Sequence, residues 1–138
     1  MFIAGGGNNV FNGYAAPNGS TTLPGAGSST LNMVATGAGN DTITTGTGNF
    51  DIDPGAGSNV VVLGTGINYV NSLGQDSITG GPAHQTAGMA DVSTIYLSGT
   101  GATVTGGGGT LNILASNGIT SPGGGLDTIT LALSLIHI

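Results

Sequence analysis

The sequence contains no lysine, no arginine and no cysteine, and its six acidic residues give a formal net charge of −6 at pH 7. Proteins that bind DNA, RNA or an anionic membrane surface use Lys and Arg to neutralise phosphate groups. The absence of basic side chains therefore argues against nucleic acid as a partner. Without cysteine, the chain has neither a disulfide framework nor thiol chemistry.

Long apolar runs are also missing. The sequence has no stretch of about 18 apolar residues, which argues against insertion of a helix into a membrane. Residues 1–8 carry neither the basic nor the apolar part of a secretory signal. A length of 138 residues corresponds to one domain at most.

Glycine, in contrast, is abundant, with 29 residues, about three times its usual share. Glycines at positions 37, 46, 55 and 64 are nine residues apart, and another Gly follows each of them two residues later. These glycines define four tandem units: TGAGNDTIT (36–44), TGTGNFDID (45–53), PGAGSNVVV (54–62) and LGTGINYVN (63–71). The eighth residue of every unit is apolar, namely Ile43, Ile52, Val61 and Val70.

The same frame recurs elsewhere without tandem spacing. Four further units share the Gly-rich start: AGGGNNVFN (4–12), PGAGSSTLN (24–32), GGGGTLNIL (106–114) and PGGGLDTIT (122–130). Their eighth residues are again apolar: Phe11, Leu31, Ile113 and Ile129. The repeat therefore extends over most of the sequence.

Each unit predicts a Gly-rich turn followed by a short strand with one inward apolar residue. Glycine suits turns that need positive φ and that stack closely on one another. Two units make one coil, and parallel stacking of coils places residues eighteen apart in register. We therefore predict an all-β fold, a parallel β-solenoid (β-roll or β-helix) of nine-residue half-coils, in which each coil buries only two side chains.

Residues 1–132 are expected to form one irregular, truncated solenoid whose clearest repeats lie at 36–80. Clusters of Gly, Pro, Asn, Ser and Ala interrupt the repeat at 13–23 and 80–91, where loops are expected. The last residues, 133–138 (LSLIHI), resemble a translated sequencing adapter and are excluded from the fold prediction.

The units resemble the glycine-rich nonapeptide G-G-x-G-x-D-x-U-x of the RTX (haemolysin-type) calcium-binding repeat family, and the unit at 36–44 is the closest copy. In that family the sixth-place Asp and the turn carbonyls bind Ca²⁺ between turns stacked on one edge. The copies here are degenerate. Only Asp41 and Asp127 hold the sixth place in the eight units, and Asp76 holds it in a shifted ninth unit, 72–80, that is one residue short. Neutral acceptors replace Asp in three other units, at Asn9, Asn59 and Asn68.

The resemblance implies calcium ligands on one edge of the solenoid. Units that begin at 36, 54 and 72 share that edge, which would stack Asp41, Asn59 and Asp76 in a column. Because Ca²⁺ takes six to eight oxygen ligands, glycine carbonyls are expected to complete the set. The candidate metal residues are Asp41, Asp76, Asn59, Gly37, Gly39, Gly55, Gly57 and Asp127. The opposite edge, with Phe50 and Asn68, is expected to bind no ion, and a metal-free solenoid is the alternative.

Other chemically interesting residues have simpler interpretations. Asp51 and Asp53 flank the inward Ile52 and are expected to point together into solvent. His84 lies in the segment GPAHQTAGMA, where a surface loop is expected. No G-x-S-x-G motif or comparable nucleophile context is present, so we do not expect an enzyme.

The predicted function is a structural, calcium-binding repeat segment of a large exported bacterial RTX-like protein or adhesin, secreted or on the cell surface. Its partners would be neighbouring repeats of the same chain and an extracellular surface or glycan. One alternative is a repeat-displayed ice- or glycan-binding face on the edge where Thr47 and Thr65 stack eighteen residues apart. A second is the C-terminal β-roll of an exported protease or lipase whose catalytic domain lies outside this sequence.

Overall fold

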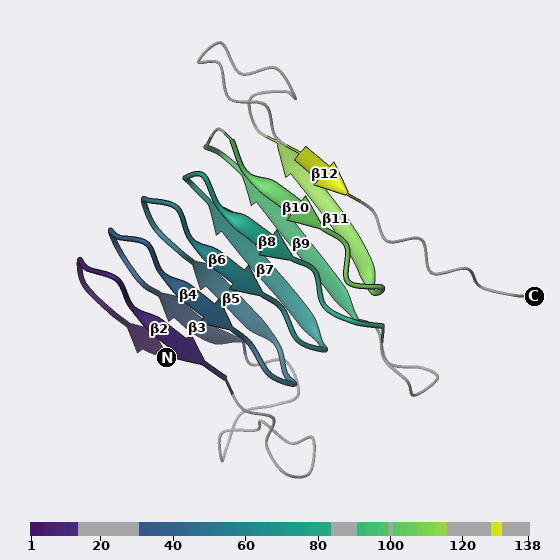
Figure 1. Ribbon diagram of the computed structural model, residues 1–138. Coiled ribbons are helices and arrows are strands. Elements are labelled where there is room, and N and C mark those ends of the chain that lie inside the picture. The colour runs from purple at the N-terminus through teal and green to yellow at the C-terminus, as the bar shows by residue number, and fades with distance from the viewer. Residues whose placement is uncertain (14–30, 84–90, 100, 116–127, 131–138) are drawn as a thin grey trace, which may run out of the picture.

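The computed structural model describes residues 1–13, 31–83, 91–99, 101–115 and 128–130, and this part of the chain contains strands and turns but no helix. The strands form two six-stranded sheets (Figure 1). Every strand pairing within the two sheets is parallel. The predicted all-β class with parallel strands is therefore confirmed for the described residues, which also contain no helix able to span a membrane.

We name the sheets by the numbers of their strands. The odd sheet contains β1 (Phe2–Ile3), β3 (Asn32–Ala35), β5 (Phe50–Asp53), β7 (Ile67–Ser72), β9 (Val92–Leu97) and β11 (Thr110–Ala115). The even sheet contains β2 (Val10–Asn12), β4 (Thr42–Thr44), β6 (Val60–Val62), β8 (Ser77–Thr79), β10 (Thr103–Thr105) and β12 (Thr128–Thr130).

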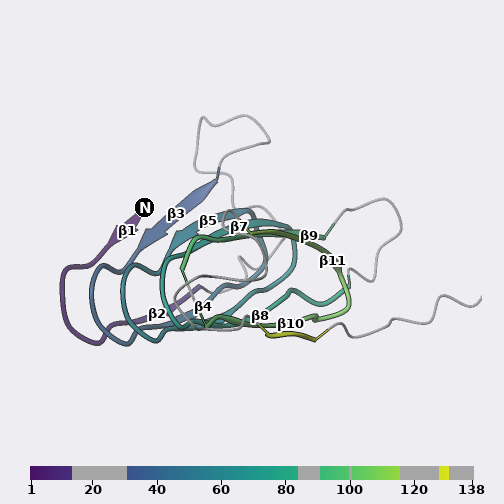
Figure 2. The same ribbon diagram turned by 90° about the horizontal axis from the view of Figure 1, so that it is seen from above.

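Successive strands alternate between the two sheets, so the chain passes back and forth between them. Viewed from above, the even strands lie along one side of the molecule and the odd strands along the other (Figure 2). We call one odd strand, the even strand that follows it and their turns a circuit. Neighbouring circuits are joined by parallel pairing in both sheets.

The register confirms the predicted spacing in the tandem region. Val34, Ile52 and Val70 pair in series across the odd sheet, and Ile43 pairs with Val61 in the even sheet, each step being eighteen residues. The next even step, from Val61 to Ile78, is seventeen residues, which matches the unit that is one residue short. The nine-residue unit therefore describes half a circuit.

Two longer steps contain the interruptions predicted from the sequence. Phe11 pairs with Ile43, 32 residues later, and Val70 pairs with Ile95, 25 residues later. Residues 13–23 and 80–91 fall within these intervals, although most of each lies outside the described residues. The sheets continue in register across both intervals.

Inward side chains occupy three places of the unit rather than one. Besides the apolar eighth place, the sixth place and the first place of the following unit are buried, as in Asp41, Ile43 and Thr45. The prediction that each coil buries only two side chains is therefore wrong. Side chains alternate along an extended segment, and each segment is long enough to turn three of them inward.

The repeat frame predicted for residues 24–32 is wrong by three residues. It makes Leu31 the inward residue, but Leu31 is 41% exposed, whereas Val34 is buried and pairs with Ile52. In the sequence, the glycines suggest which residue of this unit points inward. In the structure, strand pairing with the next circuit determines that residue. Val34 belongs to the apolar core, which runs along the molecule between the sheets with Ile43, Ile52, Val61, Val70, Ile78, Ile95 and Val104.

Glycine is required where turns of adjacent circuits stack. Gly37 and Gly55 occupy equivalent turns and have φ angles of +84° and +74°. A Cβ atom at Gly55 would collide with the carbonyl group of Gly37. Since L-residues rarely adopt positive φ, both the conformation and the close stacking exclude a side chain at Gly55.

Candidate functional site

The three residues predicted to form a column do so in the structure. Asp41, Asn59 and Asp76 each directly precede a strand of the even sheet, on three successive circuits, and each is 1% exposed. Asn9 extends the column by one circuit at its N-terminal end, through hydrogen bonds to Asp41. We call these four residues the polar column.

Hydrogen bonds run through the polar column from circuit to circuit. The backbone N–H of Asp41 donates to Asn59 Oδ1 at 2.9 Å. The backbone N–H and the Nδ2 of Asn59 both donate to Asp76 Oδ1, at 3.1 and 2.8 Å. Ser72 Oγ donates to the other carboxylate oxygen of Asp76 at 2.6 Å. The sixth-place side chains thus point inward and hold the backbones of neighbouring circuits.

The column alternates amide and carboxylate, in the order Asn9, Asp41, Asn59, Asp76. An amide supplies the N–H donors that a carboxylate lacks. Alternation also separates the two carboxylates, whose direct juxtaposition would be repulsive. The alternation of Asn and Asp along the polar column therefore has an electrostatic reason.

The side-chain amide of Asn9 lies among three backbone carbonyl oxygens and one carboxylate oxygen. Its Nδ2 is within 2.8–3.3 Å of the carbonyl oxygens of Gly5, Gly7 and Thr36 and of Asp41 Oδ1. This set of turn carbonyls and one carboxylate is similar to the ligand set expected around Ca²⁺. At this circuit the Nδ2 group of Asn9 donates hydrogen bonds to those oxygens, in the place that a cation would take.

Of the glycines predicted as ligands, two have carbonyl groups in hydrogen bonds between circuits. Gly37 O accepts from the N–H of Ala56, and Gly57 O accepts from the N–H of Gln75, both at 3.1 Å. Gly39 donates its own N–H to Ala56 O at 3.0 Å, and Gly55 donates to Asp53 Oδ1 at 3.1 Å. The predicted ligand Asp127 and the loop residue His84 lie outside the described residues.

Three buried side-chain oxygens in the described residues have no hydrogen-bond partner: Asp41 Oδ2, Asn68 Oδ1 and Asp91 Oδ2. Asp91 was not selected from the sequence, although an Asp just before the apolar segment 92–97 is a recognisable signal. Its other oxygen accepts the backbone N–H of Gly66 at 2.6 Å. No group of three His or Asp side chains gathers within the described part of the chain.

The opposite edge of the molecule, where no ion is expected, contains both apolar and polar side chains. Phe50 and Asn68 are both buried there, and Asn68 Nδ2 donates to Gly64 O at 3.1 Å. Thr65 Oγ1 donates to Thr47 Oγ1 at 3.2 Å, which confirms the predicted stack of these two threonines. Pro82 follows the glycine that stacks on Gly64, so the threonine stack does not continue into the next described circuit.

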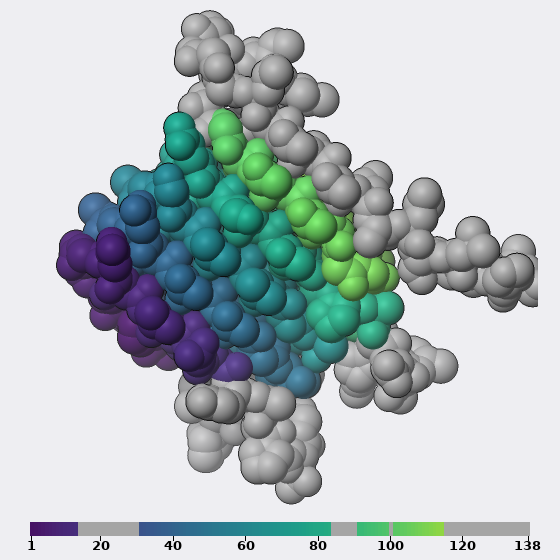
Figure 3. Space-filling model, in the orientation of Figure 1, coloured from purple at the N-terminus to yellow at the C-terminus, as the bar shows by residue number. Residues whose placement is uncertain are grey.

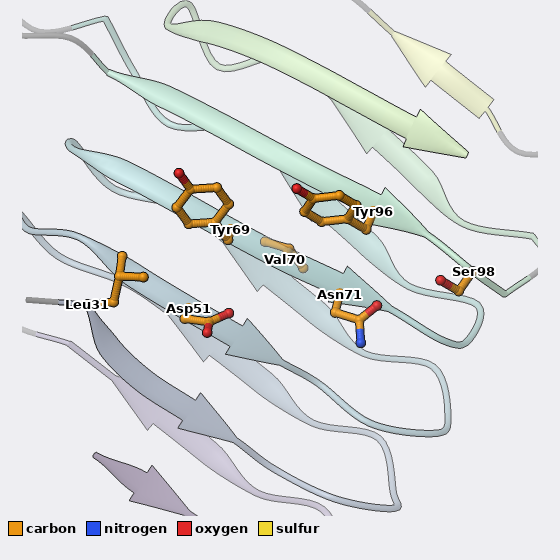
Figure 4. A pocket seen from close by; sticks show the side chains of 7 residues that line it. All are labelled: Leu31, Asp51, Tyr69, Val70, Asn71, Tyr96 and Ser98. Atoms are coloured by element: carbon orange, nitrogen blue, oxygen red, sulfur yellow. The ribbon is translucent and has the colours of Figure 1, made fainter. Parts of the chain in front are cut away.

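An open groove of about 470 Å³ lies on the outer face of the odd sheet (Figure 4). Tyr69 and Tyr96 lie on the neighbouring strands β7 and β9, and Asp51 on β5 is exposed, as predicted, together with Asp53. A groove without basic side chains offers no counter-charge to an anion and suits neutral or cationic molecules. The lining residues are Leu31, Asp51, Tyr69, Val70, Asn71, Tyr96 and Ser98.

Comparison of the chain with family models, with curated proteins and with solved structures finds no match.

Proposed function

We propose that this chain is a non-enzymatic structural segment, a parallel β-solenoid of nine-residue half-coils with degenerate RTX-like repeats, from an exported or cell-surface protein of the adhesin type. The polar column is the observation that carries the proposal. Asn9, Asp41, Asn59 and Asp76 use their side chains to bind the backbones of neighbouring circuits. Buried hydrogen bonds of this kind, from side chain to backbone, favour one arrangement of the chain.

Two further observations support a structural role. The eighteen-residue register and the strict alternation of strands between two sheets are typical of a solenoid, in which each repeat contacts only its neighbours. The apolar core continues through these circuits as one column in each sheet. The extracellular location and the adhesin class rest on the resemblance of the repeats alone.

Calcium binding stays a prediction, and one observation at Asp41 supports it. Asp41 Oδ2 is buried without a hydrogen-bond partner, and the chain has no Lys or Arg to neutralise the carboxylate. An uncompensated buried charge is costly, so a cation at this oxygen would stabilise the fold. Asp76 is a weaker candidate as a Ca²⁺ ligand, because both of its carboxylate oxygens already accept hydrogen bonds.

Thermal unfolding of the whole chain, followed by circular dichroism in EDTA and in Ca²⁺, tests both parts of the proposal. A site with Kd of about 1 mM would contribute about 1 kcal/mol at ~5 mM Ca²⁺ and raise Tm by about 2–4 °C. Asp41→Asn should abolish that rise. The matched variant Asp53→Asn changes an exposed carboxylate and should keep it.

The two parts of the proposal fail in different ways. A Tm that is the same with and without Ca²⁺ removes the calcium prediction and leaves the structural segment. A chain that shows no β-rich, cooperative transition in either buffer removes the solenoid segment itself.

A further inference from the structure

The outer face of the even sheet is a regular surface that neither the polar column nor the groove uses. In the even strands β2, β4, β6, β8 and β10 the middle residue is inward and the residues on either side point outward. Parallel pairing aligns the outward residues in two columns. One column contains Val10, Thr42, Val60, Ser77 and Thr103, and the other contains Asn12, Thr44, Val62, Thr79 and Thr105.

The side chains in these two columns are nearly uniform in shape. Five are threonine and three are valine, two residues with the same β-branched outline, and none is charged or aromatic. At the next position of the sheet, Thr128 pairs with Thr103 and Thr130 with Thr105, so the register continues. We call the ten side chains the Thr/Val face.

The odd sheet shows that strand propensity alone does not produce such a face. Threonine is favoured in strands generally, so a propensity effect would enrich both outer faces. The outer columns of the odd sheet instead mix sizes and charges. They contain Met33, Asp51, Tyr69, Thr94 and Asn112, and Ala35, Asp53, Asn71, Tyr96 and Leu114. Outward side chains of similar size and no charge are therefore a property of the even sheet and not of the odd sheet.

The Thr/Val face forms a two-dimensional lattice of hydroxyl and methyl groups. Parallel strands are about 4.8 Å apart, and alternate residues along one strand are about 6.6 Å apart. Branching at Cβ restricts χ1, so the Thr and Val side chains have few rotamers available to them. In Figure 3 the successive circuits on this side of the molecule appear as parallel rows of atoms, running from purple to green.

We propose that the Thr/Val face binds ice. Ice presents water molecules at fixed, closely similar spacings, and a rigid lattice of hydroxyls can hold its hydration water at matching positions. Methyl groups between the hydroxyls favour release of less ordered water. A charged side chain would orient water around itself, and the six aspartates of this chain are absent from the face.

Other occupants fit this face less well. Protein interfaces depend on buried aromatic and Arg anchors, and flat recognition of a sugar ring uses aromatic side chains. The Thr/Val face has neither. The aromatic residues that could serve such ligands, Tyr69 and Tyr96, lie on the opposite side of the molecule. The proposal does not depend on calcium binding or on the location of the protein.

Partition of the full chain into slowly grown ice tests the proposal, with Thr42→Lys as the test variant. The lysine places an ammonium group on the Thr/Val face, and the ice-bound fraction should fall about tenfold because the charge must be desolvated for adsorption. Thr110→Lys is the matched control, since Thr110 is an exposed strand threonine on the odd sheet. It should partition like the unmodified chain, and both variants should keep the Tm of that chain.

Three results would overturn the proposal. One is exclusion of the unmodified chain from ice to the same extent as an unrelated acidic protein. Another is an equal loss of partition in Thr42→Lys and Thr110→Lys. The third is retention on crystalline cellulose or chitin that Thr42→Lys abolishes while partition into ice does not change. If Thr42→Lys lowers the Tm, Thr103→Lys replaces it, because Thr103 is exposed in the same column on another circuit.

Discussion

Asn59 illustrates how a single side chain joins three circuits. Its Oδ1 accepts the backbone N–H of Asp41 on one side, and its Nδ2 donates to Asp76 on the other. An Asp at this place would lose the Nδ2 donor and add a third carboxylate to the column. The side chain at this place therefore acts in hydrogen bonding between circuits, and Asn suits the position of residue 59 better than Asp.

The stacking of turns predicts that Gly55→Ala destabilises the fold by about 3 kcal/mol or more, because it adds a collision with Gly37 to the strain of a positive φ. Thermal or urea unfolding measures the change. Gly5→Ala is the control: a Cβ at Gly5 would meet no atom within 4 Å, so its free energy of unfolding should change by less than about 0.5 kcal/mol. Equal effects of the two substitutions would contradict the stacking argument.

At the scale of elements, the circuit rather than the nine-residue unit is the repeating structure. An eighteen-residue step returns each strand to its own sheet, whereas a nine-residue step moves it to the other sheet. The two sheets differ in their sixth-place residues, with Asn9, Asp41, Asn59 and Asp76 before the even strands and Phe50 and Asn68 in the odd strands. The units are similar in sequence but are not interchangeable in position.

Deletion of whole and half circuits tests this directly. Removal of residues 36–53 deletes one complete circuit, places Asn59 next to Asn9 in the column, and should leave a cooperative, β-rich transition at a lower Tm. Removal of residues 36–44 deletes half a circuit and forces every later strand into the wrong sheet, so that transition should be lost. Circular dichroism melts distinguish the two outcomes. Similar melts for both deletions would show that the sheets accept either kind of unit.

At the scale of the whole molecule, stability is distributed along one axis. Each strand pairs only with the strands on either side of it in its own sheet, so the terminal strands have one pairing partner in the described part of the chain. At the N-terminal end, Phe2 and Phe11 pack against each other with ring centroids 5.1 Å apart and are only partly buried. Such an arrangement opens from its ends, because a terminal circuit has one interface to lose and a central circuit has two.

Hydrogen exchange should therefore show a gradient along the chain. Amides of the central strands β5 and β6 are expected to exchange at least about tenfold more slowly than those of β1 and β2. Exchange monitored by NMR or by mass spectrometry of peptides measures the difference. The same rate in central and terminal strands would indicate a single global opening and would contradict the one-dimensional description.

Much of the fold was predictable because its determinants are local. The spacing of glycines and apolar residues predicts parallel strands, an eighteen-residue register and the column of Asp41, Asn59 and Asp76, and the structure has all three. The frame of residues 24–32 was not predictable in the same way. Pairing of Val34 with Ile52 determines that frame, and pairing is a contact between distant segments.

The sequence by itself determined the repeat and the absence of Lys and Arg. It also determined which residues stack in the tandem region, where the spacing between units is constant. Only the tertiary structure decided which way the sixth-place side chains point and which outward residues share a surface. Thr42, Ser77 and Thr103 lie at unequal intervals in the sequence, because a short unit and an interruption separate them. Strand pairing restores a common register despite these intervals, and this is the physical reason that the Thr/Val face exists in the folded chain while no periodicity reveals it.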